Sequence, residues 1–503
     1  MNQPIGSSST PVHQSSLLTL FAVLVLHTAV NAIGFRAAVN YAAGTGAVAI
    51  VKGDFNHDGH ADLAVVNRDS DTVSILLGNG DGTFRAGGNF AVALTPRSIA
   101  VGDFNRDGNL DLAVASECAT SACVNGAVSL LFGNGDGTFR EPAVTLDAGP
   151  TSVFVLASDF NADGKLDLAV ANANLGEPSN GSISVFLGNG NGTFSSPATY
   201  KVGTTAGPLS LASGDLNGDG KPDLVAAINW NGGPSAMAVL LNDGSGGFSP
   251  AVNYATSAAG SVSVAVADLN GDGRLDVVVA QSEFFLDIFL GNGDGTFGAP
   301  AELFGGSQPA FVRVADINRD GKPDLLVTNL SGGVNNSNGT VGVLLGNGDG
   351  TFQSVFNFAA DVAPTALVVG RFNADSFADI AAVNETSNDV SVLLNSGLKV
   401  PNAVLSAMKL SFTTPVGTTS SSKTITLSNT GAGTLNISSL MFSGASGAFP
   451  ESNTCTASVP PGARCRFTVS FKPHFTGTVG ASIRIIDNSG TGVQVIRLVG
   501  TGT

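Results

Sequence analysis

The sequence predicts an all-β chain, a seven-bladed β-propeller followed by an immunoglobulin-like β-sandwich. Three observations support this fold class. The phrase Asp-Phe-Asn-x-Asp-Gly-x-x-Asp recurs along the chain. The apolar runs of the chain are short and bounded by Gly, Asn and Asp, and the composition changes after about residue 399. Four-stranded units repeated about every 50 residues are typical of propeller blades. With 65 glycines and 12% charged residues, the chain favours short strands and tight turns over long helices.

Residues 1–32 are predicted to be a secretory signal. The apolar run at residues 17–26 is too short to span a membrane, and Val30 and Ala32 suit cleavage after Ala32. The mature chain is therefore expected to be secreted, periplasmic or on the cell surface, with no membrane span. Its four cysteines fall in two local pairs, Cys118/Cys123 and Cys455/Cys465. Export favours two disulfides, and free buried thiols are the alternative.

The propeller is assigned to residues 33–397, and the second repeat illustrates one blade. Its first strand is expected at 98–104, its second at 111–115 and its third at 128–133. The Asn-Gly-Asp-Gly turn at 134–137 accepts positive φ, so it suits a hairpin that leads into a fourth strand at Phe139.

The strand count predicts how the ring closes. Third strands end near residues 77, 132, 187, 241, 290, 345 and 394, and fourth strands begin at Phe35, Phe84, Phe139, Phe194, Phe248, Phe297 and Phe352. Both sets number seven but are offset, because the chain opens on a fourth strand and ends on a third. The strand at residues 35–41 is therefore expected to complete blade seven, which removes the open sheet edge.

The recurring phrase has the donor pattern of a calcium loop. Side-chain oxygens stand at positions 1, 3, 5 and 9, a glycine at position 6 permits the turn, and the main-chain carbonyl at position 7 supplies a fifth oxygen. We expect about six Ca²⁺ ions. The predicted ligands are Asp54, Asn56, Asp58, His60 and Asp62; Asp103, Asn105, Asp107, Asn109 and Asp111; Asp159, Asn161, Asp163, Lys165 and Asp167; Asp215, Asn217, Asp219, Lys221 and Asp223; Asp268, Asn270, Asp272, Arg274 and Asp276; Asp316, Asn318, Asp320, Lys322 and Asp324. His60, Asn109, Lys165, Lys221, Arg274 and Lys322 contribute only their carbonyls.

A seventh copy, at residues 371–379, is predicted to hold no calcium. It lacks the first Asp and the Gly but keeps Asp375 and Asp379. Arg371 is expected to supply the positive charge that calcium supplies elsewhere.

The repeats resemble FG-GAP/VCBS-type repeats, the family of the integrin α-subunit propeller. The matching text is GDFNRDGNLDLAVAS at 102–116 and LGNGDGTF at 290–297, and the resemblance covers about residues 35–397. It implies a seven-bladed propeller with calcium in the loops between first and second strands.

The net charge of −16 is interpreted as unfilled metal sites. The six intact motifs hold 18 of the 39 acidic residues, and six Ca²⁺ ions would leave a net charge of about −4. An acidic chain also argues against a nucleic-acid partner. Structural stabilisation is the preferred role for calcium, with direct coordination of a ligand as the alternative.

The face opposite the calcium loops is predicted to bind an extracellular protein or glycan. Its loops vary, and they include the Cys118/Cys123 pair, Trp230 and the Phe284-Phe285 pair. The oligomeric state is left open. A non-catalytic binding or adhesion role is preferred, because the five histidines form no triad or dyad and the first strands that line the channel are small and apolar. A sugar-binding propeller and, less favoured, a calcium-dependent polysaccharide-active enzyme remain alternatives.

Residues 398–503 are assigned to the β-sandwich. Six strand-like runs in about 100 residues suggest two packed sheets. The stretches SNTGAGTLNISSL, CTASVPPGARCRFTVSFKP and VIRLVGTGT resemble abnormal-spindle/Hydin-type domains, which implies a spacer or docking module.

Overall fold

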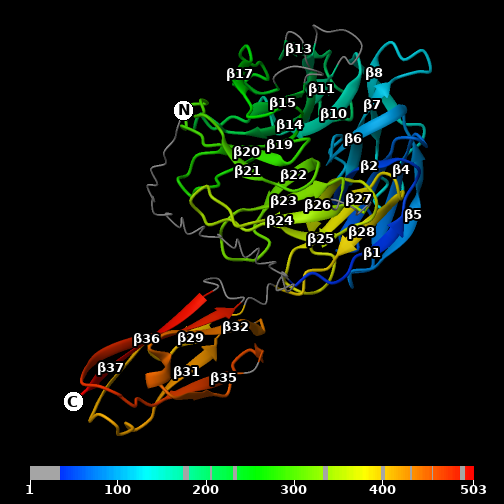
Figure 1. Ribbon diagram of the computed structural model, residues 1–503. Helices are drawn as coiled ribbons and strands as arrows, with labels where there is room; N and C mark the ends of the chain where they lie inside the picture. The colour runs from blue at the N-terminus through cyan, green and yellow to red at the C-terminus, as the bar shows by residue number, and fades with distance from the viewer. Residues whose placement is uncertain are drawn as a thin grey trace, which may run out of the picture. The chain divides into compact units, whose positions relative to one another are not determined.

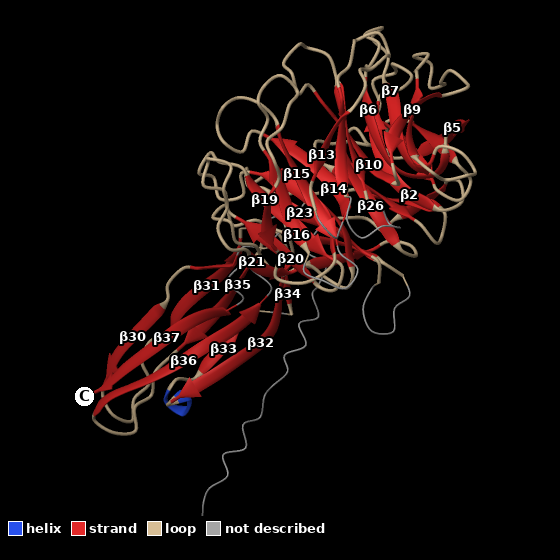
Figure 2. Ribbon diagram, turned by 90° about the horizontal axis from the view of Figure 1, so that it is seen from above, coloured by secondary structure: helices blue, strands red, loops and turns tan. Residues whose placement is uncertain are grey.

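The computed structural model describes residues 34–173, 181–203, 207–229, 235–331, 338–397, 401, 403–430, 433–455, 457–487 and 493–503. The predicted signal at 1–32 and Trp230 lie outside these residues. The described chain forms two compact units, Gly34–Leu398 and Lys399–Thr503. Within the described residues the only helical turn is the 3-10 turn η1 (Ser446–Ala448), drawn in blue in Figure 2. None of the described helices could span a membrane.

The first unit consists of seven antiparallel four-stranded sheets, which confirms the predicted propeller (Figure 1). The first three are β2 (Ala47–Gly53), β3 (Asp62–Asn67), β4 (Thr72–Gly78) and β5 (Phe84–Ala91); β6 (Leu94–Gly102), β7 (Asp111–Cys118), β8 (Gly126–Leu131) and β9 (Val144–Gly149); and β10 (Ser152–Ser158), β11 (Asp167–Asn172), β12 (Ser182–Phe186) and β13 (Ala198–Lys201). The next three are β14 (Gly207–Gly214), β15 (Asp223–Asn229), β16 (Ala236–Leu240) and β17 (Val252–Ala255); β18 (Ser261–Ala267), β19 (Asp276–Gln281), β20 (Phe285–Phe289) and β21 (Ala301–Phe304); and β22 (Pro309–Ala315), β23 (Asp324–Asn329), β24 (Thr340–Leu344) and β25 (Phe356–Ala359).

The seventh sheet joins the two ends of the unit. It contains β26 (Pro364–Gly370), β27 (Asp379–Asn384), β28 (Asp389–Leu393) and, as its fourth strand, β1 (Val39–Ala42). Val39 pairs with Val392 and Ala42 with Asp389, so blue β1 lies beside yellow β28 in Figure 1. The side-chain amide of Asn40 also donates to Asp361 Oδ2 at 2.7 Å. The first strand in sequence therefore covers what would otherwise be the exposed edge of the last blade.

Burial explains why these segments form strands. All six residues of β3, of β11 and of β19 are buried, and the four central residues of each strand are apolar, so these second strands are packed on both faces. The core lies between blades: one cluster joins Ile75 of the first blade to Leu112 and Phe139 of the second. First strands of neighbouring blades contact one another around the whole ring, so they line the central channel.

Each blade is joined to the preceding blade by a hydrogen bond. The acceptor is the main-chain carbonyl of the second residue in the recurring nine-residue motif of the preceding blade. In five blades the donor is a glycine N–H in the turn before the fourth strand, as where Gly137 N donates to Phe55 O at 2.8 Å. In the fourth and seventh blades an asparagine amide donates instead: Asn242 Nδ2 to Phe160 O at 2.9 Å, and Asn395 Nδ2 to Ile317 O at 3.0 Å. All seven joints of the ring are thus closed by a polar contact.

The second unit is a two-sheet sandwich, as expected. One sheet is β29 (Ala403–Leu405), β31 (Lys423–Asn429), β35 (Arg464–Val469) and β33 (Glu451–Asn453); the other is β30 (Lys409–Thr414), β37 (Val493–Gly502), β36 (Gly477–Asp487), β32 (Leu435–Gly444) and β34 (Ser458–Val459). Phe467, Ile483 and Ile496 are fully buried between the sheets. Both predicted disulfides, Cys118–Cys123 and Cys455–Cys465, are present.

Candidate metal centre

The six intact motifs occupy equivalent loops at one end of the propeller. Each loop leaves a first strand and ends at position 9, which is the first residue of the second strand, as with Asp62 in β3 and Asp111 in β7. The strands are antiparallel, so the turns between third and fourth strands lie at the same end. The predicted ligands of each loop are therefore brought together by one strand-to-strand connection.

Hydrogen bonds draw the side-chain oxygens of each loop inward. In the first loop Asp54 Oδ1 accepts from Asp58 N at 3.1 Å and Asp54 Oδ2 from Gly59 N at 3.0 Å. Asn56 Oδ1 accepts from Asp58 N at 3.0 Å, and Asp58 Oδ1 from His60 N at 2.9 Å. The same four bonds recur in the other five intact loops.

Two left-handed residues produce this turn. The glycine at position 6 has positive φ in every intact loop, for example 81° at Gly59. Position 4 also has positive φ, even where it carries a side chain, as at Arg106 (60°) and Ala162 (57°). Non-glycine residues adopt this region only when the surroundings impose it, so the oxygens fix the loop rather than local preference.

The position-9 carboxylates have a second role that sequence reasoning missed. Asp62 is fully buried, and its two oxygens accept from Phe55 N at 2.9 Å and from Gly78 N at 2.8 Å, which joins the loop to the end of the third strand. Equivalent pairs of bonds are made by Asp111, Asp167, Asp223, Asp276 and Asp324, and also by Asp379 of the seventh loop. The sequence contained a signal of this second role, because the seventh copy of the motif keeps Asp379 although it has lost the first Asp and the Gly.

Burial raises the pKa of these buried carboxyls, to about 6 for Asp111 and Asp324. The two backbone N–H bonds oppose this rise, and the negative charges at positions 5 and 1 add to it. The pKa of Asp62, Asp167, Asp223 and Asp276 is raised for the same reasons. The negative charges at positions 1 and 5 therefore add to the cost of ionising the position-9 carboxyl, and a hard cation held by the loop oxygens would relieve this repulsion.

The donor chemistry of the loops fits calcium, although the arrangement is not a preformed cage. Across the described ranges, no group of three or more His, Cys, Asp and Glu side chains is arranged to hold a metal ion. The position-9 carboxylate faces two backbone amides, so each turn presents two carboxylates and an amide oxygen toward its centre. Calcium in these loops stays a prediction.

The seventh loop differs from the six intact loops in its backbone conformation and in the positively charged side chain that contacts it. Neither Ala374 nor Ser376, at positions 4 and 6, has positive φ. Among the described residues, no ion pair involves Arg371. Instead Arg319 of the sixth loop donates to Ser376 Oγ at 2.6 Å and lies 5.9 Å over the Phe377 ring. Arg319 thus contacts this loop from the neighbouring blade, and the role of Arg371 stays a prediction.

The opposite end of the propeller carries exposed apolar residues and a cavity. Val124, beside the Cys118–Cys123 disulfide, is 76% exposed, and Phe284 is 46% exposed. A cavity of about 410 Å³ opens on the channel, with apolar walls that include Phe154 and Phe311. At its edge Arg97 Nε donates to Glu117 Oε1 at 2.7 Å, and Glu385 pairs with Arg68.

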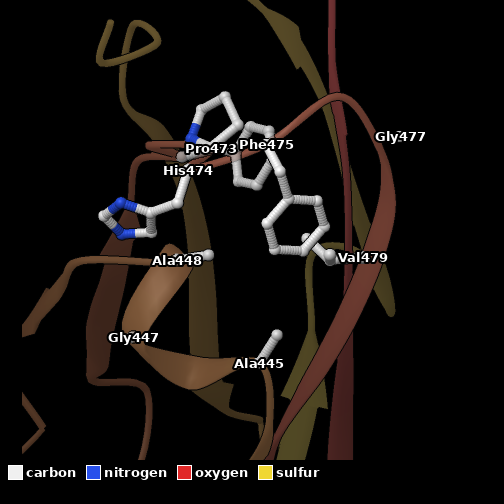
Figure 3. A pocket seen from close by; sticks show the side chains of 9 residues that line it. Ala445, Gly447, Ala448, Pro473, His474, Phe475, Gly477 and Val479 are labelled. Carbon is white, nitrogen blue, oxygen red and sulfur yellow. The ribbon is translucent and has the colours of Figure 1, made fainter. Parts of the chain in front are cut away.

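The second unit has its own hollow of about 250 Å³. Pro473, His474 and Phe475 lie on one segment across from Ala445 and Ala448 (Figure 3). The lining is mainly apolar, and His474 is its one titratable side chain.

Comparison with known proteins identifies the repeats. The FG-GAP-like repeat model matches residues 54–114, 119–170, 159–226, 217–279 and 281–327. The chain belongs to the FG-GAP-like repeat family. Residues 401–495 match the model of the ASH domain, described as abnormal spindle-like microcephaly-associated, ASPM-SPD-2-Hydin. Both resemblances inferred from the sequence are confirmed.

Solved structures of similar fold include BBS1N in complex with ARL6DN, at 15% identity and a TM-score of 0.49, covering 73% of this chain and 99% of that one. The periplasmic gluconolactonase PpgL of Pseudomonas aeruginosa matches at 17% identity and a TM-score of 0.46, covering 63% and 85%. The ASH/PapD-like domain 7 of human CEP192 matches at 16% identity and a TM-score of 0.17, covering 20% and 84%. No curated protein matches in sequence. An FG-GAP-like propeller is a fold suited to binding or adhesion.

Proposed function

We propose that this FG-GAP-like protein is an exported, calcium-stabilised and non-catalytic binding protein that engages an extracellular protein through the propeller face opposite the metal loops. The observation that carries the proposal is the contrast between the two ends. The metal loops are tied to neighbouring blades by hydrogen bonds, whereas the opposite end carries exposed Val124 and Phe284 in its loops and a cavity between its first strands. Exposed apolar groups of this kind are typical of interaction surfaces.

Calcium has a structural role in this proposal. At ~1 mM calcium and a Kd of ~10⁻⁴ M, each site stabilises the fold by roughly 1.4 kcal/mol, or about 8 kcal/mol for six independent sites. Thermal unfolding of the full chain in calcium and in EDTA tests this role. We expect a markedly lower Tm in EDTA and about six ions per chain by elemental analysis. An unchanged Tm would refute calcium stabilisation.

Protein binding is favoured over sugar binding by the positions of the tyrosines. Tyr41, Tyr200 and Tyr254 each pack edge-on against a core phenylalanine, with ring centroids 5.4 to 5.6 Å apart. Sugar sites commonly use a free aromatic face, and these rings are already engaged. A glycan array on the full chain tests the alternative: strong binding to a defined glycan would favour the lectin.

The binding face is tested with purified extracellular matrix proteins on a biosensor. Val124→Ser and Phe284→Ser should each weaken binding of a captured partner about tenfold. Val252→Ser is the matched control, because Val252 is 55% exposed on the outer strand β17. Equal loss in all three variants would place the interface elsewhere.

A further inference from the structure

Two cations on the inner strands of the propeller have no ion-pair partner among the described residues. The seven first strands contain three charged residues, Lys52, Arg97 and Arg313, and all three are cationic. Arg97 pairs with Glu117. In the described parts of the chain, neither the Lys52 amine nor the Arg313 guanidinium forms an ion pair. The expectation that the first strands are small and apolar is therefore wrong at Lys52, Arg97 and Arg313.

Both side chains face the central channel. The first strands form the inner ring, and Lys52 and Arg313 are solvent-exposed on it. The residues at the level of Arg313 on the other six strands are uncharged: Val51, Ala100, Leu156, Ala212, Ala265 and Val368. Those at the level of Lys52 are also uncharged: Val101, Ala157, Ser213, Val266, Val314 and Val369. The two cations therefore stand alone in an apolar wall.

The strands that carry the two cations, β2 and β22, both contact β26, the first strand of the seventh blade, and Arg313 contacts a residue that lines the cavity. The Lys52 side chain runs along the seventh blade, where a Cβ added to Gly370 would lie 3.2 Å from Lys52 Cδ. Arg313 places its guanidinium carbon 5.9 Å from the centroid of the Phe311 ring, and Phe311 lines the cavity. A cation that is exposed in the channel without an ion-pair partner is suited to binding an anion.

We propose that the channel binds a small amphipathic organic carboxylate, with its carboxylate at Arg313 and Lys52 and its apolar part in the adjoining cavity. A planar guanidinium matches a carboxylate in two parallel hydrogen bonds. The cavity walls supply apolar surface from Val153, Leu209 and Val262 as well as from Phe154 and Phe311. A volume of about 410 Å³ is within the range of small-molecule sites. The site goes beyond the proposed protein partner and does not rest on it.

Titration calorimetry with hexanoate on the full calcium-loaded chain tests this site. Hexanoate should bind, and hexanamide, its uncharged counterpart, should bind at least about tenfold more weakly. Arg313→Met should weaken hexanoate binding at least about tenfold, Arg313→Lys should retain much of it, and Lys52→Met should weaken it less. Lys201→Met is the matched control, because Lys201 is exposed on the outer strand β13, and it should bind hexanoate like the wild type.

Thermal unfolding separates binding from folding. Arg313→Met should melt at or above the wild-type Tm, because it removes an unpaired charge from the channel. If Arg313→Met is destabilised, Lys52→Met decides the matter, and an unchanged hexanoate affinity in that variant overturns the proposal. The proposal is also overturned if the wild type fails to bind hexanoate, if hexanamide binds equally, or if inorganic phosphate binds more tightly than hexanoate. None of these outcomes depends on Val124 or Phe284.

Discussion

At the scale of single residues, Asp379 isolates the structural role of the position-9 carboxylate. In the other six loops the same carboxylate is also a predicted calcium ligand. Asp379 joins the start of its loop to the end of the third strand by accepting from Phe372 N and Asn395 N, at 2.9 and 2.8 Å. It does so in a loop without the first Asp or the Gly of the motif. The position-9 carboxylate therefore braces a blade whether or not calcium is near.

Replacing Asp379 with alanine should destabilise the protein by about 2–4 kcal/mol, because two buried N–H groups lose their acceptor. The loss should be equal in calcium and in EDTA, measured by chemical unfolding. Asp375→Ala is the matched control in the same loop: its carboxylate is exposed and accepts from Phe377 N, so its removal should cost under about 1 kcal/mol. A loss confined to calcium-containing buffer would contradict the bracing role.

Replacing the aspartate at position 1 of the motif should, in contrast, reduce stability mainly when calcium is present. Asp54→Asn weakens one predicted calcium site, so it should remove about 1.4 kcal/mol of stability in ~1 mM calcium and little in EDTA. Unfolding curves with and without EDTA measure the difference. Equal losses in both buffers would indicate that Asp54 acts only through its bonds to Asp58 N and Gly59 N.

At the scale of elements, the residue at the end of each third strand lies close to a backbone carbonyl of the metal loop in the same blade. Different blades use glycine or asparagine at this position. In five blades a glycine stands there, and a Cβ would meet a backbone carbonyl, as at Gly188, where Leu166 O lies 2.1 Å from the added atom. In the fourth blade Asn242 occupies the position, and its Nδ2 donates to the equivalent carbonyl, Pro222 O, at 3.0 Å. The same Nδ2 also reaches Phe160 O of the preceding blade.

Asn242→Gly should therefore destabilise the propeller by about 1–3 kcal/mol, although glycine is the usual residue at this position. The buried carbonyl of Phe160 would lose its donor at the joint with the third blade. Asn134→Ala is the control, because its amide donates only to the exposed Thr138 hydroxyl, at 2.9 Å. Equal stability of both variants in a urea titration would show that the joint contributes nothing.

At the scale of the whole molecule, closure depends on a segment far from its partner in sequence. Deleting residues 33–45 removes β1 together with the hydrogen bond from Asn40 to Asp361, and it exposes the edge of β28. We expect such a chain to aggregate or unfold, and a chain lacking only residues 1–32 to remain monomeric. Size-exclusion chromatography with light scattering distinguishes these results. A stable monomer without β1 would show that closure is dispensable.

Much of this molecule could be predicted from repetition. Seven third strands and seven offset phenylalanines indicated the ring and its closing strand, because identical units leave little freedom in how they stack. The contact of Arg319 with Ser376 could not be predicted, because it depends on how the sixth and seventh loops are placed relative to each other in space. Lys52 and Arg313 were missed for a similar reason: alternation along a strand does not show which cations lie on the inner ring without an ion-pair partner.

The pairing of β1 with β28 also determines how the propeller would respond to a pulling force. Val39, at the start of β1, pairs with Val392, near the end of β28, so the two ends of the unit leave from the same end of one antiparallel pair. Tension between them would break the hydrogen bonds of that pair one after another rather than all together in shear. The seventh blade is therefore the mechanical weak point, and the ring should open there before any other blade is loaded.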